Sequence, residues 1–215
     1  MAVSKPEDFS FSAQELAVLK DTHFIQQKIK VTSKCQHFMG HLKTYLLAKL
    51  QEKKIDWEQW PWQPTSFHQA KGEDYAGFPY FVLDFPKFYQ KEDAFSFRHF
   101  LWWGHHYTQS LHLSGKYLAK VRPLLMQNQA FFEQYRCCLS ISNDPWKLHL
   151  NEEHFRAAHQ FSEAAWKSHI AESYFIRIAH FQPIEQKQGH LFPLYADFLS
   201  ATLALLRDLG EKPKK

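Results

Sequence analysis

Charged and imidazole side chains interrupt the runs of this chain that otherwise resemble buried strands. They are Asp84, Arg98, His99, His112, Arg177 and His180. Charged groups are seldom buried unless they are paired, so two interpretations stay open. One is internal pairing, for instance of Asp84 with Arg98 or Arg177. The other is a pocket with a polar floor, lined by aromatic residues. The candidate ligand-binding residues are Asp84, Arg98, His99, Trp102, Trp103, His112 and Arg177, with Tyr107 as a further wall.

The relation between the two central histidines depends on a predicted β-hairpin. A two-residue loop that begins at Gly104 has glycine where a type II′ turn favours it. This register sets Trp103 opposite His106 and makes His99 and His112 diagonal neighbours, roughly 7–8 Å apart. Two imidazoles at that distance could share a ligand, or could simply pack on neighbouring aromatic rings. A slip of one residue would exchange the two faces.

Two other groups of residues have spacings that could support chemistry. His37 and His41 are four residues apart on a predicted helix and could bind one metal with a third ligand from elsewhere. Glu152, His159 and Glu163 would share one face of a predicted helix, as a carboxylate–imidazole site or as a solvated charged face. Histidine pairs are expected by chance in a chain with 14 histidines. We therefore predict no metal site and no cofactor.

Nucleophilic and nucleotide-binding motifs are missing from the sequence. GxSxG, Walker and GxGxxG patterns do not occur. The three cysteines are Cys35, Cys137 and Cys138, with no zinc-site spacing and with two of them adjacent. A cytoplasmic location is the natural expectation for such a cysteine pattern.

Three tryptophans lie within six residues, at Trp57, Trp60 and Trp62, in a segment broken by prolines. Such a loop could stack on a sugar, a base or a peptide, or could pack its indoles over one end of the core. A net charge of +4 is too small to indicate nucleic-acid binding.

Composition indicates one folded domain. The 215 residues are 45% hydrophobic and 17% aromatic, which is enough for a packed core. We expect a flexible arm at 1–11, a single domain at 12–210 and a disordered tail at 211–215. The N-terminus has no apolar run typical of a secretory signal, and no run of about 18 apolar residues predicts a membrane span.

Periodicity and capping residues predict an α+β fold: a largely antiparallel sheet of about five to seven strands, two N-terminal helices, inserted helices and a C-terminal helix packed on it. Strands are predicted near 65–71, 80–85, 95–103, 106–113, 131–142, 146–150 and 173–182. Helices are predicted near 12–30, 33–54, 114–130 (with a kink at Pro123), 151–168 and 191–209, and 71–77 is predicted to be a loop.

Three functions remain open on the sequence alone. The first is a non-enzymatic module that binds a small molecule or a protein in an aromatic pocket. The second is a metal-dependent or acid–base enzyme that uses the sheet histidines. The third is single-stranded nucleic-acid binding through the tryptophan-rich loop. We expect no membrane partner, consider nucleic acid unfavoured, and keep a homodimer open.

Overall fold

The computed structural model describes residues 10–54 and 66–207. The chain divides into two compact units, Met1–Phe38 and Met39–Lys215. Whether 12–210 behaves as one domain stays a prediction.

The predicted arm and tail, apart from residues 10 and 11, lie outside the described residues. So do the three tryptophans of the proline-broken loop.

Two helices open the chain. α1 (Ala13–Lys20) begins with a capping box, in which Ser12 and Glu15 bond each other's backbone N–H groups. α2 (Thr22–Glu52) is a single helix that crosses the boundary between the units. The break between α1 and α2 lies at Asp21, whose carboxylate accepts from the Phe24 N–H. The predicted break near residue 32 is therefore wrong, because Asp21 supplies the N-terminal cap.

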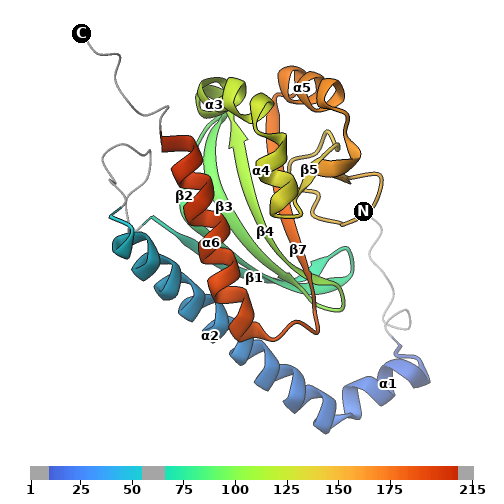
Figure 1. Ribbon diagram of the computed structural model, residues 1–215. Helices are drawn as coiled ribbons and strands as arrows, with labels where there is room; N and C mark the ends of the chain where they lie inside the picture. The colour runs from blue at the N-terminus through green and yellow to red at the C-terminus, as the bar shows by residue number, and fades with distance from the viewer. Residues whose placement is uncertain (1–9, 55–65, 208–215) are drawn as a thin grey trace. The chain divides into compact units, whose positions relative to one another are not determined.

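The second unit contains a seven-stranded antiparallel sheet, which confirms the predicted α+β class (Figure 1). The order of its strands is β1-β2-β3-β4-β7-β5-β6. Their bounds are β1 (His68–Tyr75), β2 (Phe78–Gln90), β3 (Asp93–Trp102), β4 (His106–Ser114), β5 (Cys138–Ser140), β6 (Phe155–Ala157) and β7 (Phe175–Pro183).

One face of this sheet is covered by α6 (Gln188–Arg207), which runs obliquely across β2 and β3 in Figure 1. Phe198 of α6 lies 6.1 Å from the Phe97 ring, centroid to centroid. The later part of α2 buries its apolar residues in the second unit, at Met39, Leu42, Leu46 and Leu50. α6 is also the described helix with the length and composition to cross a membrane. Half of that stretch is buried in the protein, as in the core helix of a globular domain.

The opposite face is covered by the irregular segment between β5 and β6. Its Leu148 packs in a cluster with Phe100 and Trp102. Tyr75 fixes the segment, because its hydroxyl donates to the Trp146 carbonyl and accepts from the Leu148 N–H at 2.6 Å. α3 (Gly115–Gln127), α4 (Gln129–Gln134), the 3-10 turn η3 (Ala158–Gln160) and α5 (Glu163–Glu172) complete the unit.

The central hairpin differs from its predicted register by one residue. β3 ends at Trp102, which pairs with His106, so the connection has three residues. Gly104 has φ +73°, in the left-handed region that favours glycine. The faces are exchanged as a consequence, and His99 and His112 lie on opposite sides of the sheet.

Several other predicted boundaries are wrong. Pro86 does not end β2, because it sits at a register shift where the ladder does not need its N–H. β1 includes much of the predicted loop at 71–77. The predicted helix at 114–130 is α3, which contains Pro123, followed by the start of α4. In the predicted strand at 131–142, residues 131–134 belong to α4 and residues 138–140 form β5. Residues 146–150 are irregular. The predicted helix at 151–168 is replaced by β6, η3 and the start of α5, because the cap is at Ser162.

The turn between β4 and α3 gives a testable consequence for stability. Gly115 has φ +57°, and a Cβ there would lie 2.2 Å from an Asp93 carboxylate oxygen and 2.9 Å from the Glu92 carbonyl oxygen. We expect Gly115→Ala to lower the free energy of unfolding by about 1–3 kcal/mol. Gly189→Ala in α6 is the matched control, with nothing within 4 Å of its Cβ, and should be neutral or slightly stabilising. If urea denaturation showed the same change in the free energy of unfolding for both substitutions, the left-handed backbone and close contacts of Gly115 would not be what requires glycine there.

Candidate functional site

Five of the predicted site residues lie on the sheet face away from α6, and four of them pair directly in the ladder. In the ladder, Asp84 of β2 pairs with Arg98 of β3, and His112 of β4 pairs with Arg177 of β7. Side chains of directly paired residues share one face. The two pairs therefore form a polar floor across four adjacent strands.

Asp84 and Arg98 form a buried bidentate ion pair. Arg98 Nε and Nη2 donate to the two Asp84 carboxylate oxygens at 2.7 and 2.9 Å. The Asp84 side chain is 2% exposed and that of Arg98 15%. The predicted internal pairing of Asp84 with Arg98 is thus confirmed. Both oxygens of the Asp84 carboxylate bond Arg98, so this carboxylate makes its ion pair with Arg98 and not with Arg177.

Arg177 is fully buried at the centre of the floor. Its Nη2 bonds His112 Nδ1 at 3.0 Å. Among the described residues, Nε and Nη1 of Arg177 find no hydrogen-bond partner. Burial, together with the positive charge of Arg98, lowers the pKa of Arg177 to about 10, so the group remains a cation at neutral pH.

The electrostatic balance of the floor is therefore positive. It contains two guanidinium groups and one carboxylate, and that carboxylate already bonds Arg98. Burial holds the pKa of His112 well below its usual value, and the two arginines lower it further. The imidazole is neutral, and Nδ1 accepts from Arg177, so the ring proton is on Nε2. The floor carries one excess positive charge out of water, which is costly without a counter-charge.

Other polar atoms of the floor also have no partner in the described part of the chain. They are Ser110 Oγ and the hydroxyl of Tyr89, both buried. Ser110 is the direct ladder neighbour of Arg98. Burial raises the pKa of Tyr89, and the nearby Asp84 charge raises it further. These hydroxyls can donate to an anion without an internal bond having to break first.

Trp146 covers this floor. Its ring lies 5.0 Å from the Arg98 guanidinium carbon and 5.8 Å from that of Arg177. His112 stacks at 5.9 Å from the same indole and at 6.0 Å from Phe175 on its other side. Trp146 itself is 49% exposed. The Trp146 ring thus packs against both guanidinium groups.

A cavity of about 450 Å³ adjoins this tryptophan. Its walls include five aromatic or imidazole rings: Tyr89, His112, Trp146, Tyr174 and Phe175. Lys91 and Glu92 also line it and balance each other in charge. The volume is in the range of pockets for small molecules.

The remaining predicted site residues lie elsewhere. His99 faces α6, where its ring lies 5.4 Å from Tyr195 and its Nε2 bonds the Phe85 carbonyl. Trp103 is in the β3–β4 turn and stacks on Phe81. The hypothesis that His99 and His112 share a ligand is wrong, because the sheet lies between them.

Trp102 shares the floor's face but belongs to a separate aromatic group. It stacks on His105 at 3.5 Å, and its indole N–H donates to the Tyr75 carbonyl. The predicted wall residue Tyr107 faces α6, where it receives a hydrogen bond from Gln188.

Sequence reasoning missed Trp146, Tyr89 and Ser110. A tryptophan directly after the Asn143-Asp144-Pro145 turn was the one available signal, because a large ring in a polar segment needs something to cover.

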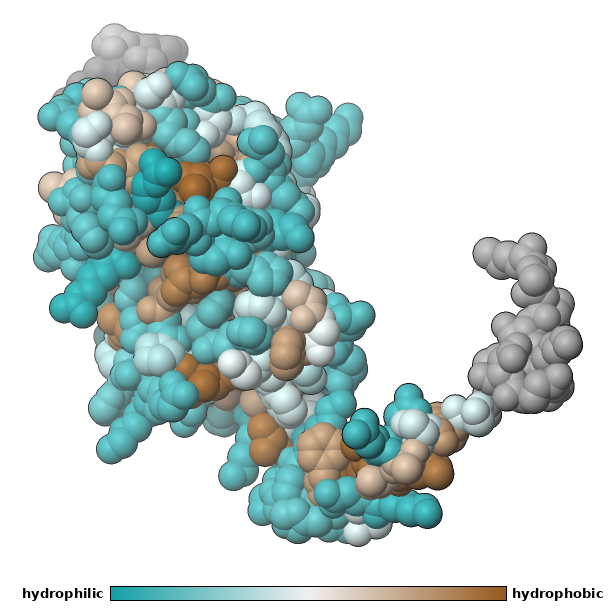
Figure 2. Space-filling model, turned by 90° about the vertical axis from the view of Figure 1, so that its right-hand side faces the viewer, coloured by the Kyte–Doolittle hydropathy of each residue, from teal (hydrophilic) through white to brown (hydrophobic). Residues whose placement is uncertain are grey.

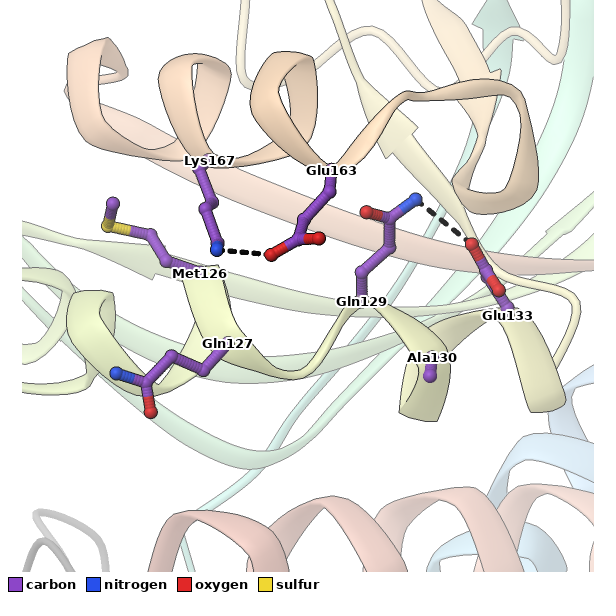
Figure 3. A pocket seen from close by; sticks show the side chains of 7 residues that line it. All are labelled: Met126, Gln127, Gln129, Ala130, Glu133, Glu163 and Lys167. Atoms are coloured by element: carbon purple, nitrogen blue, oxygen red, sulfur yellow. Dashed lines mark hydrogen bonds and ion pairs between the residues drawn. The ribbon is translucent and has the colours of Figure 1, made fainter.

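Two other hollows in the second unit are less suited to a ligand. The groove between α3, α4 and α5 has an open volume of about 530 Å³ (Figure 3). Its polar side chains already bond one another, as Lys167 does with Glu163 and Gln129 with Glu133. A hollow of about 340 Å³ beside Ser140 and His169 is lined mainly by loop residues. Ser140 Oγ has no partner among the described residues, but no buried charge adjoins this hollow.

The alternative chemical sites find no support among the described residues. No group of three His, Cys, Asp or Glu side chains could hold a metal in that part of the chain. His37 and His41 are both exposed on α2. Glu152 lies in a turn, His159 in η3 and Glu163 at the start of α5. Burial raises the pKa of the Cys137 thiol well above its usual value, which disfavours the thiolate.

Comparison with known proteins adds no assignment. No protein-family model, curated protein or solved structure matches this chain.

The charge imbalance predicts opposite effects for two substitutions. Asp84→Ala leaves both guanidiniums without a counter-charge and should lower the free energy of unfolding by about 3–5 kcal/mol. Arg177→Met removes the excess charge at similar volume, and we expect a change between zero and about 2 kcal/mol of stabilisation. Urea denaturation of both variants measures this. If Arg177→Met lowered the free energy of unfolding as much as Asp84→Ala does, the floor would not carry an excess positive charge.

Buried neutral histidines predict acid sensitivity. Burial lowers the pKa of His99, His106 and His180 from 6.5 to about 4. The unfolded chain takes up these protons near pH 6.5 and the folded chain only near pH 4. The stabilisation is therefore complete above pH 6.5 and is lost as pH falls toward 4. At pH 5 each histidine should contribute about 2 kcal/mol less than at pH 7.5.

Urea denaturation at the two pH values tests this dependence. His99→Gln should flatten the pH profile. Equal stability of the native chain at pH 7.5 and pH 5 would contradict the buried neutral state.

Proposed function

We propose that this protein is a non-enzymatic binding module for a small organic anion that has a planar apolar part. The ligand would occupy the cavity beside Trp146. The observation that carries the proposal is the fully buried Arg177 guanidinium, with two nitrogen atoms that lack partners among the described residues and no carboxylate of its own. A bound anion would supply the counter-charge.

The walls of the cavity suit a flat ligand. Tyr89, His112, Trp146, Tyr174 and Phe175 present rings on which a planar group can stack, as in small-molecule pockets with aromatic walls. The small number of polar groups among these rings would fix the orientation of the ligand.

Selectivity for an anion would come from the floor. The Lys91 and Glu92 side chains at the cavity cancel in charge, so the excess charge is that of the interior. His112 Nε2–H is the donor next to the cavity, and the two guanidiniums lie behind His112 and Trp146. A unit charge roughly 7 Å away contributes about 2 kcal/mol at an effective dielectric constant of 20. A ligand that displaced Trp146 would reach the guanidiniums directly.

The other functions considered have less support. The enzyme hypothesis required His99 and His112 to act together, and they are on opposite faces. Nucleic-acid binding through Trp57, Trp60 and Trp62 concerns residues outside those that the structure describes, and it stays a prediction.

A matched pair of probes tests this function. We expect 2-naphthoate to quench tryptophan fluorescence and raise the melting temperature, and neutral 2-naphthamide to do neither at the same concentration. The amide preserves shape and removes the charge. The preference for naphthoate should fall about tenfold or more in Arg177→Met, since about 2 kcal/mol of charge attraction is lost.

Arg156→Met is the control, because it removes an exposed arginine and changes the net charge equally. Equal binding of acid and amide, no binding of either, or the same loss in Arg156→Met would each refute anion selectivity at this site.

A further inference from the structure

The first unit exposes a concentration of apolar side chains. Thirteen large hydrophobic side chains of the described residues are exposed, and eight of them lie between Phe11 and Val31. α1 has no buried residue at all. Figure 2 shows brown and tan side chains along the segment that adjoins the grey N-terminal residues. Exposed apolar groups at this density mark an interaction surface. The members are Phe11, Leu16, Val18, Leu19, Phe24, Ile25, Ile29 and Val31.

The charges in the same segment are biased toward positive. Residues 10–38 hold four lysines against one glutamate and one aspartate, and no acidic residue occurs between Thr22 and Phe38. The described part of the first unit has two acidic residues, and both bond backbone N–H groups at the N-terminus of a helix. Glu15 completes the capping box of α1, and Asp21 caps α2. Lys30 and Lys34 are exposed on α2.

The distribution of apolar groups favours a flat partner over a groove. At 100° per residue, Phe24, Ile25, Ile29 and Val31 spread over about 160° of the α2 circumference. Leu16, Val18 and Leu19 spread as widely on α1. Helices that enter a protein groove use a narrow stripe on one continuous helix. Basic helical segments with a broad apolar arc are typical of segments that lie in the interface of a bilayer.

We propose that the first unit docks on the surface of an anionic lipid bilayer. The apolar side chains of α1 and the start of α2 enter the headgroup region, and Lys30 and Lys34 contact the lipid phosphates and carboxylates. The positive charge of this segment opposes the alternative, in which two copies pack these faces together. This is peripheral binding, so it departs from the expectation of no membrane partner without requiring a membrane span.

Vesicle co-sedimentation of the full chain tests the proposal. We expect binding to phosphatidylcholine vesicles that contain about 30% phosphatidylserine to exceed binding to pure phosphatidylcholine at least tenfold, and about 0.5 M salt to abolish most of it. Lys30→Glu with Lys34→Glu, and separately Phe24→Ser with Ile29→Ser, should each reduce binding at least tenfold. Lys120→Glu with Lys187→Glu, two exposed lysines of the second unit, should leave it unchanged.

Other results would overturn the proposal. Equal binding to both vesicle types, or an equal loss in the control variant, would remove the specific role of this segment. A dimer in analytical ultracentrifugation that Phe24→Ser with Ile29→Ser dissociates, without lipid binding, would assign the surface to a second copy. Binding of 2-naphthoate by the second unit is measured separately, so the two proposals can fail independently.

Discussion

One guanidinium group without a counter-charge sets the main constraint on this structure. Arg177 is as buried as the leucines of the core, yet both oxygens of Asp84, the carboxylate of this floor, bond Arg98. A buried, unbalanced charge is among the most costly features a fold can retain. Apolar packing elsewhere in the sheet must offset that cost. A protein retains such a feature where function needs it, which is why this floor, and not the larger groove by α4, is the candidate site.

The surroundings of Arg177 fit a binding role better than a catalytic one. His112 is the closest imidazole, and its Nδ1 is occupied by Arg177, so it cannot readily accept a proton from a substrate. The Cys137 thiol is buried. What the site does offer is preorganised positive charge beneath aromatic walls, with one exposed tryptophan as cover. These are the requirements for holding an anion in place.

Local sequence patterns predicted much of the fold, because strands and helices are dictated by periodicity and capping residues. The Ser12 capping box, the β7 pattern and the meander of β2, β3 and β4 all follow from them. The register of the hairpin did not follow, since Trp103-Gly104-His105 allows a two- or three-residue connection and only packing decides. That single residue separated His99 from His112. Trp146 could not be placed on the floor from sequence, because its position depends on Tyr75, 71 residues away in the chain.

The most direct test of an anion site on this floor is to follow the Arg177 side chain while an anion is titrated into the protein. Nitrogen-15 NMR of the arginine Nε–Hε groups, with Arg177 assigned by its loss in Arg177→Met, reports its hydrogen bonds. We predict a slowly exchanging Hε signal that shifts when 2-naphthoate is added and does not shift with 2-naphthamide. An Hε signal that ignores both compounds would contradict a role for Arg177 in holding an anion.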